Sequence, residues 1–406
     1  MNRCYAPYWG LMKGFNHIVR NRSAWCEALF CLALLAVFLP VKIYPLVFLV
    51  ASAFFAADTK VWTPYRWAIY LAVFTGYAVA VFLIGLPAGQ PELTNFLKLL
   101  INFTFLYTAV MWLAPRNNVR LLGWVDVALH IALALTLLQL LVYHQAVGFR
   151  WLGGAATSAQ GSALYQSGTY FWGLDDKNMF GARIALLGFV YVLLPVVRLK
   201  AIVWWRIVLV LLLAWLSLSR TPMVALLMGV GFLVWLAANT RWRVVLGALV
   251  ALALPVVALR VVRIENITAS NDGMGVRLTY WKAFFEHFSA ISPLGNGFMS
   301  GSDFLSRHAA FYHGEPHIHN TFLSCYLDFG VVGLLAYALF LYHYFRFGVE
   351  KYRNLLFWWV AFVPLLAIMM ILYSGYDNDI VLYLVLVFLL GSVGPVRVKQ
   401  LNGRIG

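Results

Sequence analysis

The chain has 406 residues, of which 63% are hydrophobic and only 11% are charged. Because soluble domains carry about 25% charged residues, this composition excludes an ordinary soluble protein and predicts an integral membrane protein. The net charge of +15 does not indicate nucleic-acid binding, since the basic residues stand singly between apolar runs rather than in one basic domain. The four cysteines show no metal-type spacing, and we expect neither a disulfide framework nor a zinc site.

Residues 1–24 are expected to form a cytoplasmic segment. Between residues 3 and 22, basic residues alternate with apolar residues at helical spacing: Tyr8, Met12, Phe15 and Val19. This pattern is typical of a helix on an anionic membrane surface, and a disordered basic tail is the alternative. The first apolar run ends at Pro40 and Lys42 without a small-residue cleavage site, so no cleavable signal is expected.

Apolar runs of about the length that a bilayer requires follow along the chain. The first two share Pro40 and are expected to be either a broken hairpin or a re-entrant pair. We therefore expect an all-α polytopic membrane protein with about 12 transmembrane helices and a large outer loop that contains interfacial helices. The predicted spans are residues 25–39, 41–57, 65–86, 94–114, 120–146, 178–197, 202–218, 222–238, 243–262, 320–344, 354–373 and 379–396.

The positions of Lys and Arg predict the orientation of these spans. With the N-terminus in the cytoplasm, every short cytoplasmic connection carries at least two basic residues, whereas the short outer connections at 87–93 and 374–378 carry none. Both termini are therefore expected inside. Nine spans then lie within residues 25–262, three lie within 319–396, and residues 397–406 form a cytoplasmic tail.

Two long loops are expected on the outer side, at about 147–177 and at 263–318. Loops of this length are usually functional or disordered. The second contains an apolar stripe at helical spacing, which predicts a helix between Val276 and Ile291 that lies flat on the outer membrane face. The stripe consists of Tyr280, Trp281, Phe284, Phe285 and Phe288. Residues 292–297, Ser-Pro-Leu-Gly-Asn-Gly, are expected to end this helix.

Arg220 lies beside the predicted start of an outward-facing helix, with Thr221 as N-cap and Pro222 as first helical residue. An arginine beside free helix N–H groups favours phosphate binding. The alternative is a snorkelling arginine, which Lys would replace freely. Arg277 shares the apolar face of Trp281 and Phe284, so it is expected to need an anionic partner, either lipid headgroups or a bound pyrophosphate.

Histidines cluster at the end of the second loop. His313, His317 and His319 precede a helix expected from about Asn320 to Tyr344. His319 is a candidate general base, and a capping or hydrogen-bonded core histidine is the alternative. Gly330 and Gly333 lie on one face of this helix, where they would let a neighbouring helix come close.

Acidic residues precede two further helix starts on the outer side: Asp175 and Asp176, and Asp377 with Asp379. Such acids cap helices by default. The Asp-x-Asp pattern at 377–379 formally matches the metal site of soluble glycosyltransferases, but nucleotide sugars are absent from the outer side, so we expect no metal. Within one span, Asp126, His130 and His144 form either a proton path or an ordinary buried polar interaction.

The motif formed by His319, Asn320, Gly330 and Gly333, nine residues separating Asn320 from Gly330, resembles the signature of bacterial O-antigen ligases. These enzymes share a superfamily with O-antigen polymerases and protein O-oligosaccharyltransferases. The stretch from Arg277 and Trp281 to Pro293, Gly295 and Gly297 also resembles the superfamily pattern. The resemblance covers roughly residues 170–395.

The resemblance implies transfer of an O-antigen polysaccharide from undecaprenyl diphosphate to a lipid A–core sugar hydroxyl. The reaction would be inverting, would use no metal or cofactor, and would occur on the periplasmic face of the inner membrane. In order and setting, the family's two essential arginines and its essential histidine match Arg220, Arg277 and His319, which are therefore the expected catalytic residues. Substrate contacts are expected from Arg220, Arg277, His317, Asn320, Asp377 and Asp379.

Other functions remain open from the sequence. An O-antigen polymerase uses the same type of donor with a second lipid-linked glycan as acceptor. A protein O-oligosaccharyltransferase is disfavoured, because such enzymes usually carry a further periplasmic region after the late spans. A glycolipid transporter or flippase would need charges or broken helices near the bilayer midplane and inverted repeats, whereas the polar residues here gather at one face.

Overall fold

The computed structural model describes residues 22–39, 41–60, 62–85, 92–149, 177–256, 273–312, 314–371 and 375–393. Within these ranges the chain forms helices and no strands. Several predictions fall on residues outside these ranges: the amphipathic segment at 3–22, most of the loop at 147–177 with Asp175 and Asp176, residue His313, and the tail at 397–406.

A helix occupies the position of each predicted span. These helices are α2 (Arg22–Ala36), α3 (Tyr44–Asp58), α4 (Arg66–Gly85), α5 (Leu93–Leu113), α6 (Val119–Ala146), α8 (Lys177–Leu199), α9 (Trp204–Leu216), α10 (Arg220–Ala237), α11 (Thr240–Val256), α14 (Thr321–Tyr352), α15 (Leu355–Met369) and α16 (Asn378–Gly391). The second long loop contains α12 (Gly273–Glu286), the 3-10 turn η5 (Phe288–Ala290) and α13 (Gly301–His308).

Among the described helices, six are long and apolar enough to cross a membrane: α4, α5, α6, α8, α10 and α14. The 15 residues of α2 or of α3 extend only about 22 Å at 1.5 Å per residue, whereas a bilayer core is about 30 Å thick. The fold is therefore a polytopic helical bundle, and the number of twelve spans stays a prediction.

The core of the bundle is formed by α8 and α16, which pack against each other. All residues of α16 are buried, because this helix is apolar on every side and can be stable only inside the protein or the membrane. Helix α16 also packs on α5, and α8 also packs on α9 and α10. The described helices around this pair expose apolar side chains at the perimeter, α11 most extensively.

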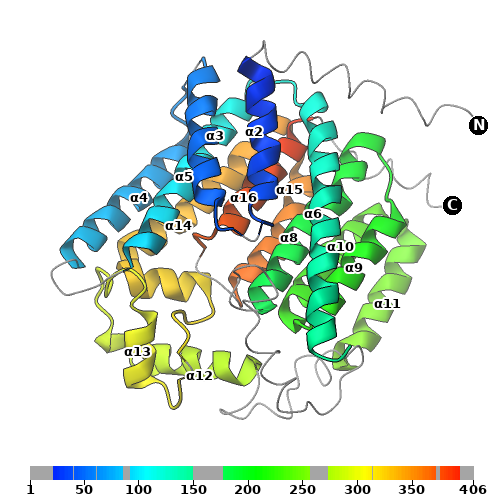
Figure 1. The fold of residues 1–406 in the computed structure, drawn as a ribbon. Coiled ribbons are helices and arrows are strands. Elements are labelled where there is room, and N and C mark those ends of the chain that lie inside the picture. The colour runs from blue at the N-terminus through cyan, green and yellow to red at the C-terminus, as the bar shows by residue number, and fades with distance from the viewer. Residues whose placement is uncertain are drawn as a thin grey trace, which may run out of the picture.

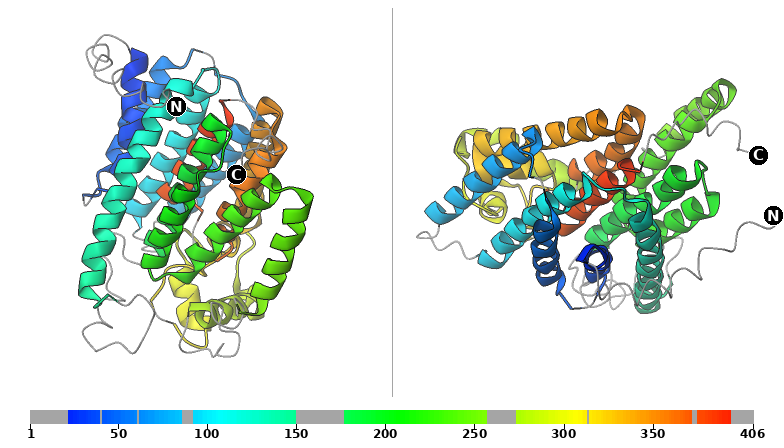
Figure 2. Two further views of the ribbon diagram at one scale, coloured as in Figure 1. Left: turned by 90° about the vertical axis from the view of Figure 1, so that its right-hand side faces the viewer. Right: turned by 90° about the horizontal axis from the view of Figure 1, so that it is seen from above.

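Helices α12 and α13 lie at one end of the bundle (Figure 1; Figure 2, left). At this end α10 begins beside the start of α8, since Ser219 Oγ donates to Asn178 Oδ1 (2.6 Å). Helix α14 begins there beside the end of α15, since Asn320 Nδ2 donates to the Met370 carbonyl oxygen (3.0 Å), and α16 starts shortly after α15 ends. We call this the α12 end. It gathers the starts of α8, α10 and α14. Helix α16 begins deeper in the bundle, because Asp379 bonds to Arg183, about two turns into α8, and Tyr376 O accepts from Asn102, near the middle of α5.

The helices on either side of Pro40 pair with each other. Helices α2 and α3 pack together, and both lie in the upper half of the view in Figure 1, short of the α12 end. Their length and position favour a re-entrant pair over a hairpin that crosses the bilayer twice.

Candidate active site at the α12 end

Helix α12 packs on α13 and on the segment that precedes α14. Tyr280 and Phe284 are fully buried there in a small second core with Phe304, Leu305 and Ile318. The prediction that the aromatic stripe faces a membrane is therefore wrong for these two residues, because the rest of the loop provides a protein surface for them. Only Phe285 and Phe288 of the stripe stay exposed.

Arg277 lies in this buried layer, with 7% of its surface exposed. Its Nε–H donates to the carbonyl oxygen of Ile371, just beyond the end of α15 (2.9 Å). The C-terminal end of a helix carries partial negative charge, so it stabilises a guanidinium at a place where the sequence predicted an anionic partner. One N–H of Arg277 thus has a protein acceptor, and the arginine is fixed at the α12 end.

His319 stands next to the same helix. Its ring is parallel to the ring of Tyr280 (2°), with centroids 5.9 Å apart. Tyr280 follows Arg277 by three residues, about one turn of α12, and its hydroxyl donates to the carboxylate of Glu315. The backbone of His319 has a positive φ of 56°, a conformation that few residues other than glycine adopt.

Asn320 is the N-cap of α14. Its side-chain oxygen accepts from the N–H groups of Phe322 (2.9 Å) and Leu323 (3.1 Å), and its amide nitrogen donates to Met370 O (3.0 Å). Both functions of the side chain are therefore used inside the protein. This gives Asn320 a structural role, and a substrate contact through it stays a prediction.

Replacing Asn320 by Asp is expected to keep the cap and to lose the bond to Met370. A carboxylate accepts from the same N–H groups but faces the Met370 carbonyl oxygen without a hydrogen to donate. We expect a loss of stability of about 1–3 kcal/mol, measured by thermal unfolding in detergent. Asn320→Ala, which removes both functions, should lose more. Equal stability of the Asp variant and wild type would contradict this role.

His317 is half-buried, and burial lowers its pKa from 6.5 to about 4. The imidazole is therefore neutral at pH 7, which leaves it unsuited to binding an anion through positive charge. A depressed pKa in a basic group means that the unfolded chain binds the proton more readily than the folded chain.

The folded protein should consequently lose stability as the pH falls from 6.5 to about 4, and His317 should contribute nothing to this change above that window. In His317→Gln the slope of the melting temperature against pH should be shallower inside the window and unchanged at higher pH. Parallel curves for the two proteins would show that His317 remains accessible to protons in the fold.

Arg220 is exposed and is the first residue of α10. The N-cap is Ser219, not Thr221 as predicted, and Pro222 is the third helical residue. Proline is tolerated there because N–H groups of the first turn have no partner within the helix. The Ser219 hydroxyl bonds to Asn178 instead of capping its own helix. Arg220 thus lies at the α12 end, beside the start of α8.

The acidic residues at the start of α16 have separate surroundings. Asp377 occupies the N-cap position, as expected, although it makes no side-chain capping bond. Asp379 is buried and accepts from Arg183 Nε (2.9 Å), and Arg183 also donates to the Val37 carbonyl oxygen. The carboxylate of Asp379 is therefore balanced inside the protein. Sequence reasoning missed Arg183, although an arginine within an apolar span is a recognisable signal.

Two glycines, Gly295 and Gly330, allow the second loop to pack closely on α14. Helix α14 is kinked at Gly330 (φ 61°, ψ −159°), and the turn around Gly295 lies against this kink. The Val331 N–H donates to Pro293 O (2.9 Å) and the Asn296 N–H donates to Leu327 O (2.8 Å). The predicted close approach at Gly330 is therefore made by a turn of the outer loop, not by a neighbouring helix.

In the described residues, His319 thus stacks on Tyr280, which follows Arg277 by one turn of α12. Asn320 is adjacent to His319, and Arg220 lies at the same end of the bundle. Tyr280 and Glu315, which contact each other and of which Tyr280 contacts His319, are additional residues of the candidate site. The sequence placed Tyr280 in an aromatic stripe, but its ring partner depends on the folded loop. Within the described residues, no group of three or more His, Cys, Asp or Glu is placed to hold a metal ion, and the metal-independent reaction stays a prediction.

These features define a multi-pass helical membrane protein with a histidine and arginines gathered at one end. Residues 205–338 match a family model described as O-antigen ligase, which confirms the resemblance to an O-antigen ligase-type family over that part of the chain. The match contains Arg220, Arg277 and His319 but neither Asp377 nor Asp379, and it is shorter than the predicted coverage. A search of curated proteins finds no significant match. The family match supports an enzyme of the O-antigen ligase or polymerase type in a bacterial membrane.

Proposed function

We propose that the protein is an O-antigen ligase of the bacterial inner membrane. It transfers a polysaccharide from undecaprenyl diphosphate to a sugar hydroxyl of the lipid A–core, on the periplasmic face. The observation that supports this proposal most is the packing of α12 against the segment before α14, which stacks His319 on Tyr280, one helical turn from Arg277. The match to the O-antigen ligase family model supports a lipid-linked polysaccharide as the substrate class.

The negative charge of the leaving group is the reason that the proposed reaction needs arginines. A lipid diphosphate is stable as an anion, so no protein acid has to protonate it. The transition state requires positive charge where negative charge develops on the diphosphate. Arg277 and Arg220 supply that charge in this proposal. The nearby start of α10, which has no capping bond from the Ser219 side chain, adds N–H groups with a favourable dipole.

The acceptor requires a base. Removal of the proton from the sugar hydroxyl as it attacks the anomeric carbon falls to His319 in this proposal. Direct displacement by that oxygen breaks the bond to the diphosphate and inverts the anomeric centre. The stacked Tyr280 ring, held by its bond to Glu315, keeps the imidazole in place during the transfer.

Arg277→Lys tests the role of the guanidinium. Lysine keeps the charge but lacks the planar set of five donors, so it cannot both hold Ile371 O and contact a diphosphate. We expect the transfer rate of purified protein to fall about 100-fold or more. Arg353→Lys, an exposed arginine at the opposite end of the bundle, is the matched control and should keep the wild-type rate. Full activity of Arg277→Lys would contradict the proposed contact.

A deletion strain separates ligase from polymerase. Loss of a ligase leaves unsubstituted core and accumulates lipid-linked polymer. Loss of a polymerase leaves core capped with one repeat unit. We expect the first result, and single-unit capping would assign the chain to the polymerase reaction.

A further inference from the structure

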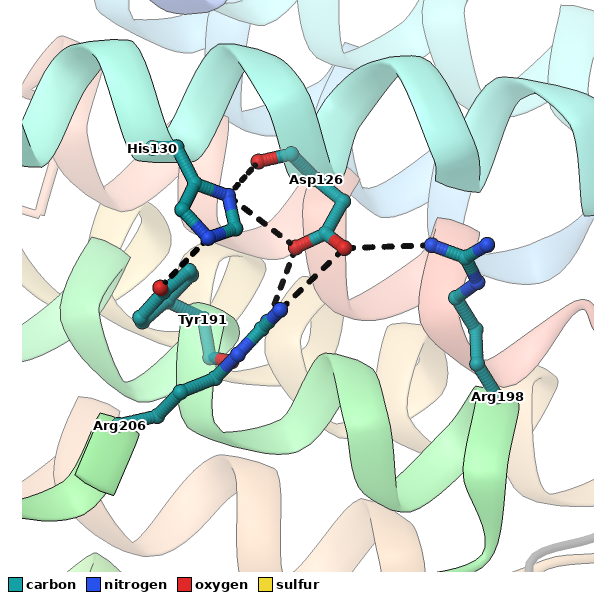
Figure 3. A network of polar contacts seen from close by, with 5 residues as sticks. All are labelled: Asp126, His130, Tyr191, Arg198 and Arg206. Atoms are coloured by element: carbon teal, nitrogen blue, oxygen red, sulfur yellow. Dashed lines mark hydrogen bonds and ion pairs between the residues drawn. The ribbon is translucent and has the colours of Figure 1, made fainter. Parts of the chain in front are cut away.

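A second cluster of charged residues lies at the opposite end of the bundle, between α6, α8 and α9 (Figure 3). Asp126 of α6 accepts from Arg206 Nη1 of α9 (2.9 Å) and from Arg198 Nη1 of α8 (3.2 Å). His130, one turn further along α6, bonds through Nε2 to the Tyr191 hydroxyl (2.8 Å). His144 lies about 21 Å from His130 along the same helix. Asp126, His130 and His144 therefore do not form one proton path.

The cluster carries more positive than negative charge. Arg206 is buried, contacts the Asp126 carboxylate through both Nη atoms, and lies over the Tyr191 ring (4.1 Å). Arg206 therefore neutralises Asp126 by itself. Arg198 adds a further positive charge through a single hydrogen bond, and 37% of its side chain is exposed. The excess charge is thus carried by the residue that faces outward.

The cluster lies at the level of lipid headgroups. The 28 residues of α6 extend about 42 Å, which exceeds the bilayer core of about 30 Å. Asp126 lies only two turns from the start of that helix, beside the end of α8 and the start of α9. The adjacent Trp204 and Trp205 are exposed, and such tryptophans are enriched where a membrane meets water.

We propose that Arg198 binds the phosphate of an anionic phospholipid in the leaflet at this end of the bundle. The exposed His130 lies on the other side of Asp126 (Figure 3), one turn further along α6 and next to Trp205. Arg198 has N–H groups beyond the one that Asp126 accepts, and a charged group at this depth is stabilised by an anion. The exposed imidazole of His130 lies close to the Trp205 ring (6.3 Å between centroids), so an apolar surface is available for the glycerol and upper acyl chain.

The test is lipid retention by the purified full-length protein, measured by native mass spectrometry after incubation with phosphatidylglycerol or with phosphatidylcholine. Wild type should retain phosphatidylglycerol in preference to phosphatidylcholine. Arg198→Gln should retain about fivefold less phosphatidylglycerol, the effect of one basic residue near a membrane surface. Its fold should persist, because Arg206 still pairs with Asp126.

Two variants and one competitor complete the experiment. Arg353→Gln removes an equal charge from the same end of the bundle and should leave retention unchanged. Asp126→Asn frees both arginines and should increase retention. Equal retention by wild type and Arg198→Gln, or equal loss in Arg353→Gln, would overturn the proposal. Displacement of the lipid by inorganic phosphate alone would also overturn it, since the site would then recognise free phosphate.

Discussion

Replacement of His319 by Asn is expected to abolish polysaccharide transfer. Asparagine tolerates a positive φ, so the backbone before α14 should keep its conformation while the base is lost. General-base catalysis contributes about 10²–10⁴-fold to a rate, and a drop of this size is expected for the purified protein with lipid-linked donor and lipid A–core acceptor. The melting temperature should remain close to that of wild type.

The matched control is His308→Asn. His308 lies on α13 in the same loop, next to His287, which follows Tyr280 by seven residues. Transfer by this variant should match wild type. If His319→Asn transferred polysaccharide at the wild-type rate, a group other than the imidazole would have to remove the proton of the acceptor hydroxyl.

Replacement of Gly330 by Ala should have the largest effect on the fold. A Cβ atom at this position would lie 2.1 Å from the Pro293 carbonyl oxygen and 2.5 Å from the Gly295 nitrogen, and these are backbone atoms that cannot rotate away. The conformation at φ 61° and ψ −159° is also one that essentially only glycine adopts. We expect a loss of at least about 3 kcal/mol in stability and loss of transfer.

Transfer should be lost in Gly330→Ala because the turn at 293–295 positions α12, and therefore Arg277, relative to the start of α14. The control is Gly76→Ala in α4, where an added Cβ meets nothing within 4 Å. Alanine is the better helix former, so that variant should be as stable as wild type or slightly more stable. Thermal unfolding of the three proteins in detergent compares them directly, and equal melting temperatures would refute the close approach at Gly330.

The sequence predicted the positions of the helices well, because hydropathy is a local property. A run of about 20 apolar residues is enough to indicate a membrane helix. It also predicted α12 from its aromatic stripe. It could not predict what α12 packs against, since burial of Tyr280 depends on Ile318, which lies 38 residues further along the chain. The helix was therefore placed on a membrane surface, whereas part of its stripe is covered by protein.

The candidate site was predicted only in part, because contacts between residues far apart in the sequence cannot be inferred from local spacing. The residue types and their order selected Arg277 and His319 as candidates, and the structure stacks His319 on Tyr280, one helical turn from Arg277. The N-cap of α10 was predicted two residues too late, because the Ser219 hydroxyl bonds to Asn178 on another helix. The pairing of Arg183 with Asp379 joins residues 196 positions apart, which no spacing rule along the chain reveals.

The account is tested most directly by reconstitution of the purified protein with undecaprenyl diphosphate-linked polysaccharide, lipid A–core and EDTA. We expect the polysaccharide to appear on the core with release of undecaprenyl diphosphate, and we expect this transfer to vanish in the Arg277→Lys and His319→Asn variants. Transfer that requires a divalent metal, or extension of a second lipid-linked glycan in place of the core, would contradict it.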